Sequence, residues 1–497
     1  MMAGYGDRKR LVAGLLLIVM LFPIIRPRAL EADFSVDFAT VISSGPSHWG
    51  TNTWWTDQDA GLWTTRWREL GLTLARVPVS HALLEPENDN ADPAITDPTG
   101  FLLNTPISMP LGITRTLTYR TWFEALRAQP EVDVMIMLAY LAPWLSDNPP
   151  HSGYVFPVAP YPPNDLAEYQ EFVEALLRYL VEDLGFPPER LLVEAMNEPD
   201  LGCGQDPAVP CFWQNWTMQD VADVVRVTHD AIAEVAPEIR LVGLAECCGT
   251  SVVRQLLDGY PEGSYLEGLS YHYYAPSGYS ITEALNRGTL LGGYGLPLFL
   301  DEYGSLEYHS EGINGGLWHS WVLPDIWKAG IAPAQYPISE HPLHPEPYNS
   351  MGLFRDWTYA IPWERKPAYW AYADFYHLAA GSVISSTAPA NNGLKALATR
   401  RFIGGAAQAT VWVVNRQDTP MTDQTFAIYN FPGSAAALHV YDGLITNTAI
   451  LTASLSGAPL IFTATLPARS VRAFVISSTE QLNIRLYLPL VLRDTVS

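Results

Sequence analysis

Eight short apolar runs, each followed by a stretch with helical periodicity, constrain the fold of this chain more than any other feature. They lie between Trp49 and Leu378. Near-continuous apolar runs are typical of parallel strands buried on both faces, and eight strand–helix pairs are the number that closes a βα barrel. The predicted strands are His48–Trp54, Leu74–Val79, Val134–Tyr140, Leu191–Asn197, Arg240–Ala245, Leu266–Tyr273, Leu296–Glu302 and Ile331–Tyr336.

The stretches between these runs predict amphipathic helices. In Asp165–Leu184, apolar residues recur at the spacing of one helix face, and Met218–Val235 repeats the pattern. We therefore predict a (β/α)8 TIM barrel over residues 33–378.

The residue pattern changes after Gly381, where short β-rich runs replace the helical periodicity. These runs are Ala409–Val414, Thr425–Tyr429, Ala437–Tyr441, Leu460–Ala464 and Val471–Ile476. They predict a C-terminal all-β sandwich over residues 379–478. Phe34–Val41 also alternates apolar and polar residues, so we expect that segment to add a strand to the β domain. Residues 479–497 form a tail with a Leu/Val-rich patch, to which we assign no role.

The N-terminus has the pattern of an export signal. Basic residues at 8–10 precede an apolar run, Leu11–Ile25, which is shorter than the roughly 20 residues of a membrane-spanning helix. We predict a signal peptide over residues 1–32. Arg26 and Arg28 lie where cleavage regions are usually uncharged, so a short uncleaved anchor is the alternative. Both readings place the protein outside the cytoplasm, either secreted or tethered to the cell surface.

Charge and motif content exclude several kinds of partner. The chain has 29 Lys plus Arg against 52 Asp plus Glu, a net charge of −23, which would repel nucleic acid. It contains no phosphate-binding Gly-rich loop after a strand, no HExxH and no Ca²⁺-loop pattern. We therefore predict no cofactor, no metal and no nucleic-acid partner.

The cysteines are few and clustered: Cys203, Cys211, Cys247 and Cys248. An exported compartment permits disulfides, and four cysteines allow three connectivities, all of which stay open. Adjacent cysteines seldom pair because disulfide geometry favours well-separated backbones. No His lies at a ligand-like spacing from these thiols, so we interpret them as staples that hold loops.

Carboxylates end two of the predicted strands. The fourth run, LLVEAMNEPD, closes with Asn197, Glu198 and Pro199, and the seventh, PLFLDEYGS, contains Asp301 and Glu302. In a βα barrel the chemistry lies at the carboxyl ends of the strands, and three βα units between these motifs place them across one barrel mouth. Neighbouring strand residues point to opposite faces, so Asp301 competes with Glu302 for the inward position.

An Asn-Glu-Pro after the fourth strand, with a Glu closing the seventh, resembles the clan A glycoside hydrolases, which are retaining glycosidases on this barrel. The run LARVPVS with Arg76 is similar to family 5, and SYHYY with His272 and Tyr274 is similar to families 5 and 39. Lys366–Tyr372 resembles the last barrel helix of such enzymes, and Leu466–Ile476 resembles the last strand of their β-sandwich. The third run ends LAYLAPW, without the His that family 5 often has there.

The resemblance implies that Glu198 is the acid/base and Glu302 the nucleophile. Retaining cleavage needs one carboxylic acid that protonates the leaving oxygen and a second carboxylate, about 5 to 5.5 Å away, that attacks the anomeric carbon. Two ionised carboxylates so close would repel each other, so we expect one of them to hold a proton at the working pH.

The resemblance also suggests residues that bind substrate or orient the acids. Asn197 would hydrogen-bond the sugar 2-hydroxyl, while Arg76 and Tyr274 are candidates to keep Glu302 ionised and oriented. We group these three with His272 as expected substrate-binding residues. The alternatives are that Arg76 is only a buried ion-pair partner and that His272 is a core imidazole.

Two further strand carboxylates are weaker candidates. Glu194 lies deeper in its strand and is interpreted as structural, whereas Glu246, beside the cysteines, is a possible substrate contact.

Tryptophans cluster near the predicted strand ends, and indole rings pack against the C–H faces of sugars. We expect Trp144, Trp213 and Trp318 to be platforms for a carbohydrate.

The sequence thus predicts an exported retaining β-glycosidase that cleaves polysaccharides or oligosaccharides by double displacement. Alternatives are a transglycosylase with the same two acids, and a carbohydrate-binding barrel protein that has lost turnover.

Overall fold

The computed structural model describes residues 32–478, apart from 54–59, 91, 97, 110–112, 115–116, 149–157, 202–212, 341–349, 356–360, 362 and 446–447. The predicted export signal, Cys203, Cys211 and the C-terminal tail lie outside the described residues. Within these residues, no helix is both long and apolar enough to cross a bilayer.

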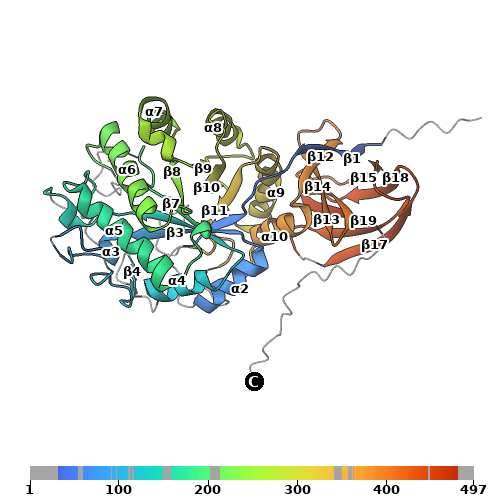
Figure 1. The fold of residues 1–497 in the computed structure, drawn as a ribbon. Coiled ribbons are helices and arrows are strands. Elements are labelled where there is room, and N and C mark those ends of the chain that lie inside the picture. Colours follow the sequence, from blue (N-terminus) through green and yellow to red (C-terminus); the bar gives the residue numbers. More distant parts are fainter. Residues whose placement is uncertain are drawn as a thin grey trace, which may run out of the picture.

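Eight parallel strands close into a barrel (Figure 1). They are β2 (Gly50–Asn52), β3 (Leu74–Ser80), β6 (Asp133–Ala139), β7 (Leu191–Glu194), β8 (Arg240–Glu246), β9 (Gly268–Ala275), β10 (Leu298–Ser305) and β11 (Ala332–Gln335). Neighbouring strands follow the order β10-β11-β2-β3-β6-β7-β8-β9. Each overlaps one predicted run, so the predicted (β/α)8 barrel is confirmed.

Helices surround the barrel (Figure 1). They are α2 (Ala60–Leu70), α3 (His81–Leu84), α4 (Tyr119–Arg127), α5 (Leu166–Arg178), α6 (Met218–Val235), α7 (Ser251–Gly259), α8 (Thr282–Gly292), α9 (Gly312–Lys328) and α10 (Pro367–Asp374). The α6 bounds match the prediction, and α5 continues as a π-turn over Tyr179–Asp183. Both helices begin at side-chain caps, because Asp165 and Thr217 accept N–H groups of the first turn. Short 3₁₀ turns lie at Pro143–Leu145, Pro188–Arg190 and Pro261–Tyr265, and β4 (Ser108–Met109) pairs antiparallel with β5 (Ile113–Thr114).

The remaining strands form a second domain, a nine-stranded sheet in the order β17-β16-β19-β14-β13-β12-β1-β15-β18. They are β1 (Phe34–Ser43), β12 (Ser382–Thr387), β13 (Leu394–Ile403), β14 (Ala406–Asn415), β15 (Met421–Tyr429), β16 (Ala435–Asp442), β17 (Ala449–Ser456), β18 (Leu460–Leu466) and β19 (Ser470–Ser478). The segment before the barrel therefore joins this sheet, where β1 pairs antiparallel with β12 and parallel with β15.

This sheet folds over itself into two layers. Phe426 of β15 and Phe474 of β19 lie five places apart in the strand order, yet their ring centroids are 4.7 Å apart. The two layers enclose a common apolar core. The all-β domain is confirmed, with the refinement that its two layers belong to one continuous sheet.

The two domains share a packed interface built on α9 and the segment after α10. Trp412 of β14 is fully buried, packs edge-on against Phe375 and donates its indole N–H to the Ser320 carbonyl of α9 at 3.2 Å. The β domain thus packs against the outer helical layer of the barrel, on the side of α9 and α10 (Figure 1).

Candidate active site

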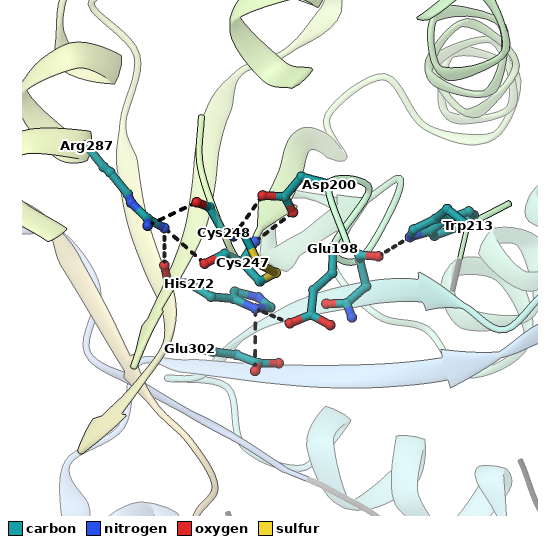
Figure 2. The surroundings of a disulfide bond; sticks show 9 residues. Glu198, Asp200, Trp213, Cys247, Cys248, His272, Arg287 and Glu302 are labelled. Atoms are coloured by element: carbon teal, nitrogen blue, oxygen red, sulfur yellow. Dashed lines mark hydrogen bonds and ion pairs between the residues drawn. A yellow bond between two sulfur atoms is a disulfide. The ribbon is translucent and has the colours of Figure 1, made fainter. Parts of the chain in front are cut away.

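A strained turn after β7 carries the first predicted acid. Asn197 still pairs with Ala245, but Glu198 has a φ of 52°, a left-handed conformation that residues with a Cβ rarely adopt. Backbone bonds hold the turn, because the Glu198 N–H donates to the Ala245 carbonyl and the Glu198 carbonyl accepts from Leu201, both at 2.9 Å. The turn directs the Glu198 side chain toward His272 (Figure 2).

A β-bulge in β10 places the second acid. In the pairing of β10 with β9, Leu300 is opposite Tyr271 and Glu302 is opposite His272, which leaves Asp301 as an extra residue. The bulge interrupts the usual alternation of faces, so two consecutive carboxylates both point into the barrel. Asp301 and Glu302 therefore do not compete for one inward position, because both carboxylates contact the buried guanidinium of Arg76.

The two predicted acids meet although 104 residues separate them in the chain. Glu198, His272 and Glu302 each offer one atom to a cluster whose atoms lie within 4.8 Å of one another. His272 Nδ1 is 3.0 Å from Glu198 Oε1 and 3.6 Å from Glu302 Oε2. The imidazole therefore bridges the two carboxylates on the open end of the barrel (Figure 2).

Arg76 of β3 connects the groups beneath this pair. Its Nη1 donates to Glu302 Oε1 at 2.5 Å and to Asn52 at 2.9 Å, and its Nη2 donates to Asn197 Oδ1 at 2.7 Å and to Glu194 at 2.6 Å. Because Arg76 is 0% exposed, it cannot touch substrate. The expectation of a substrate contact is wrong at this position, and Arg76 is instead a buried residue that orients Glu302 and Asn197.

His272 and Tyr274 of β9 complete the surroundings of Glu302. His272 is fully buried, so it too contacts the acids rather than a sugar, which corrects its assignment as a substrate-binding residue. Tyr274 donates its hydroxyl to Glu302 Oε2 at 2.5 Å. Each oxygen of Glu302 therefore receives a donor, one from Arg76 and one from Tyr274.

Burial and charge set the protonation of this cluster. Burial lowers the pKa of His272, but the carboxylates of Glu302 and Asp301 outweigh it and raise that pKa well above 6.5. Burial alone would raise the pKa of Asp301, yet Arg76 and His272 hold it below its usual value. Burial raises the pKa of Glu194 to about 8, against the opposing effect of Arg76. Burial therefore favours the protonated form of Glu194, whereas Arg76 and His272 favour the ionised form of Asp301.

Two of the three predicted tryptophan platforms donate to backbone carbonyls, and the third is buried in the core. Trp213 donates its indole N–H to the Asn197 carbonyl at 2.5 Å, and Trp144 donates to the Glu85 carbonyl at 3.1 Å. Trp318 is 1% exposed in α9 and stacks on Tyr303 in the core. The prediction that Trp318 faces a carbohydrate is therefore wrong, because α9 buries that side of the helix against the barrel.

Sequence reasoning missed the role of Asn52, and it named Glu246 as a possible substrate contact, which the structure corrects. Asn52 of β2 donates to the Asp301 carbonyl at 2.6 Å and thereby supports the bulge, although its strand has only three residues. Glu246 is not exposed to substrate, because its carboxylate accepts the N–H groups of Val252 and Val253 at the start of α7. The position of Asn52 at the end of a predicted strand could have indicated its role. The contact of Glu246 with α7 could not be predicted, because it depends on how the helix packs.

Cys247 and Cys248 form a disulfide with each other, against the expectation that adjacent cysteines do not pair. The dipeptide follows β8 directly, at the end of the barrel where the acids lie (Figure 2).

No protein-family model matches the chain, and no curated protein sequence does. The fold is similar to solved structures over nearly their whole length. A glucosidase from Croceicoccus marinus superimposes with a TM-score of 0.65 at 15% identity, covering 90% of this chain and 99% of that one. A monomeric beta-xylosidase from Caulobacter crescentus gives 0.63 at 14% identity, with 90% and 99% covered. A glycoside hydrolase family 30 subfamily 8 xylanase from Clostridium acetobutylicum gives 0.59 at 17% identity, with 90% and 100% covered. At these identities the likeness establishes a shared fold, a barrel with an appended β domain.

Proposed function

We propose that the protein is a clan A retaining glycoside hydrolase that cleaves β-glycosidic bonds by double displacement, with Glu198 as acid/base and Glu302 as nucleophile. The observation that carries the proposal is the approach of these two side chains, with oxygens within 4.8 Å across the carboxyl end of the barrel. Retaining enzymes hold their carboxyl groups about 5 to 5.5 Å apart, whereas inverting enzymes leave about 6.5 to 9.5 Å for a water.

In the first step, Glu302 attacks the anomeric carbon while Glu198 protonates the departing glycosidic oxygen. Arg76 and Tyr274 each donate to one oxygen of Glu302 and hold it in a single orientation. With the His272 imidazole charged, its Nδ1–H donates to Glu198 Oε1, which leaves the other carboxyl oxygen of Glu198 to carry the transferred proton.

In the second step, Glu198 is ionised and takes a proton from water, which attacks the same anomeric carbon and releases Glu302. Asn197 supports both steps. Its Oδ1 accepts from Arg76, so the amide N–H₂ is the group turned to the sugar 2-hydroxyl. That hydrogen bond strengthens as the ring approaches the oxocarbenium-like transition state.

The names of the structural neighbours suggest a substrate class. A glucosidase, a beta-xylosidase and xylanases share this fold, so β-linked gluco- and xylo-configured oligosaccharides are the first substrates to test. We also propose that the protein acts outside the cytoplasm, on the basis of the signal-like segment at residues 1–32 and a disulfide that an oxidising compartment permits. The mass of the protein recovered from culture fractions of an expressing host would distinguish cleavage from anchoring.

The decisive experiment compares wild type with Glu198→Ala, Glu302→Ala and Glu246→Gln on aryl β-glucosides and β-xylosides. Glu246→Gln is a matched control, since it changes a buried carboxylate of the neighbouring strand that faces α7 instead of the acids. Glu302→Ala should lose all turnover. Glu198→Ala should retain the glycosylation step for activated leaving groups, and azide should accelerate its turnover and yield a β-glycosyl azide.

Two results would refute the proposal. One is wild-type hydrolysis with inversion at the anomeric carbon, seen by NMR of the first product. The other is activity of Glu302→Ala equal to that of Glu246→Gln.

A further inference from the structure

The adjacent disulfide lies beside the proposed acid/base. The chain from Glu198 to Asp200 runs along the end of β8 and the residues that follow it. The Glu198 N–H donates to the Ala245 carbonyl of β8, and the Asp200 carboxylate accepts from Cys247 and Cys248. Figure 2 shows the disulfide between Asp200 and the Glu198–His272 pair. The two sulfur atoms are therefore part of the rim of the active site.

Every backbone polar group of the dipeptide is already bonded. Asp200 accepts the N–H of Cys247 at 2.9 Å and that of Cys248 at 2.8 Å. Arg287 of α8 donates to the carbonyl of Cys247 at 3.0 Å and to that of Cys248 at 3.2 Å, and also to the His272 carbonyl at 3.3 Å. A carboxylate and a guanidinium thus clamp the dipeptide from both sides and tie it to β9.

With these groups bonded, the dipeptide has no backbone donor or acceptor left for a ligand, and its side chains contain only carbon and sulfur. Cys248 is exposed and Cys247 half-buried. A disulfide is polarisable and offers no strong hydrogen-bond donor, so its surface is apolar. A rigid apolar surface beside polar groups is the composition of a sugar-binding subsite, where a ring's C–H face packs while its hydroxyls bond elsewhere.

The position around the rim identifies which part of the substrate would meet this surface. The disulfide follows β8, next to the strand that leads to Glu198 and two strands from Glu302 in the barrel order. Glu198 protonates the oxygen that leaves with the aglycone, so the leaving group departs on the Glu198 side. We propose that the Cys247–Cys248 disulfide is a binding surface for the leaving-group sugar, an inference that rests on the proposed glycosidase function.

The test compares two substrates that share the same glycone. A β-glycosyl fluoride places only a fluorine atom in the leaving-group subsite, whereas a β-linked oligosaccharide fills it with a sugar. For the double variant Cys247→Ala/Cys248→Ala, kcat/KM on the oligosaccharide should fall about tenfold, the size typical of losing one apolar contact. On the glycosyl fluoride it should stay within about twofold of wild type, since that substrate makes no contact there.

Reduction of the wild-type protein supplies an independent arm. Dithiothreitol transfers two electrons and two protons to the disulfide, giving two thiols while it becomes the cyclic disulfide. Reduction should reproduce the substrate-selective loss, and reoxidation should reverse it. The same treatment of Cys203→Ser/Cys211→Ser, which retains Cys247 and Cys248, should give the same loss and thereby assign it to this pair.

The possible outcomes distinguish failure of the leaving-group subsite from failure of the proposed glycosidase function. Wild type that fails to hydrolyse any glycosyl fluoride or oligosaccharide with retention contradicts the proposed function. Wild type that is active, with a double variant that retains full activity on both substrates or loses both equally, overturns the subsite. Equal loss would mean that the disulfide only holds Glu198 in place.

Discussion

The buried guanidinium of Arg76 offers the most informative single perturbation. Replacing it with Met keeps much of the volume but removes the cation that contacts Glu194, Asp301 and Glu302. Glu194 can take up a proton when Arg76 is lost, because burial already raises its pKa to about 8. The charge of Asp301 would be poorly compensated in this variant. It is fully buried, and its remaining cationic partner, His272, is 3.7 Å away.

Breaking a buried ion pair from one side costs about 3–5 kcal/mol, because the surviving charge is left uncompensated. At about 2.1 cal/mol/K of unfolding entropy per residue over roughly 450 folded residues, that loss lowers Tm by about 3 to 5 °C. Activity should fall more steeply. Loss of a preorganised charged donor at the reacting carboxylate lowers kcat by about 10²- to 10³-fold.

The assay is calorimetry together with kcat on an aryl β-glycoside, for Arg76→Met, Arg76→Lys and Arg178→Met. Arg178 pairs with Glu182 and Glu234 at the surface, so its variant should stay within about 1 kcal/mol of wild type. Arg76→Lys keeps the charge but loses the planar fork, so it should fall between the other two. If Arg76→Met unfolds within 1 °C of wild type and retains its kcat, Arg76 does not organise the acids as described.

Three further outcomes are expected. Tyr274→Phe removes a donor 2.5 Å from Glu302, so kcat/KM should fall about 10- to 100-fold, the value of one hydrogen bond to a charge; an unchanged rate constant would contradict the role of that hydroxyl. Trp318→Ala should lower the free energy of unfolding in urea by about 3–5 kcal/mol and leave KM unchanged, whereas a raised KM would show that Trp318 contacts substrate. Burial and the Lys366 charge lower the pKa of His319 to about 3. The folded state therefore binds fewer protons than the unfolded chain between pH 3 and about 6.5, and stability falls as the pH drops through that window by up to about 1.4 kcal/mol per unit; urea midpoints at pH 7 and pH 4 should differ less in His319→Gln than in wild type.

The barrel could be predicted because its strands are buried on both faces, so each strand has an almost continuous apolar sequence. The same runs located the two acids, since a charged residue directly after such a run marks the barrel mouth. Glu198 and Glu302 were therefore readable as a pair.

The details that were missed depend on contacts distant in sequence. The bulge at Asp301 is a one-residue shift in register that leaves the hydrophobic pattern almost unchanged. Trp318 lies in α9, whose buried residues leave little polar face to show which side meets the barrel. The pairing of Cys247 with Cys248 accompanies a clamp whose two members, Asp200 and Arg287, come from different loops and helices.

The side chain that forms the covalent intermediate is the most direct test of the account. The protein should be incubated with 2,4-dinitrophenyl 2-deoxy-2-fluoro-β-glucoside and the corresponding β-xyloside, which slow release of the intermediate, and then digested for mass spectrometry. We predict one equivalent of glycosyl group per chain, attached to Glu302 in the peptide that spans β10. A label on any other residue, or hydrolysis of the parent glycoside without a trappable intermediate and with inversion, would contradict the account.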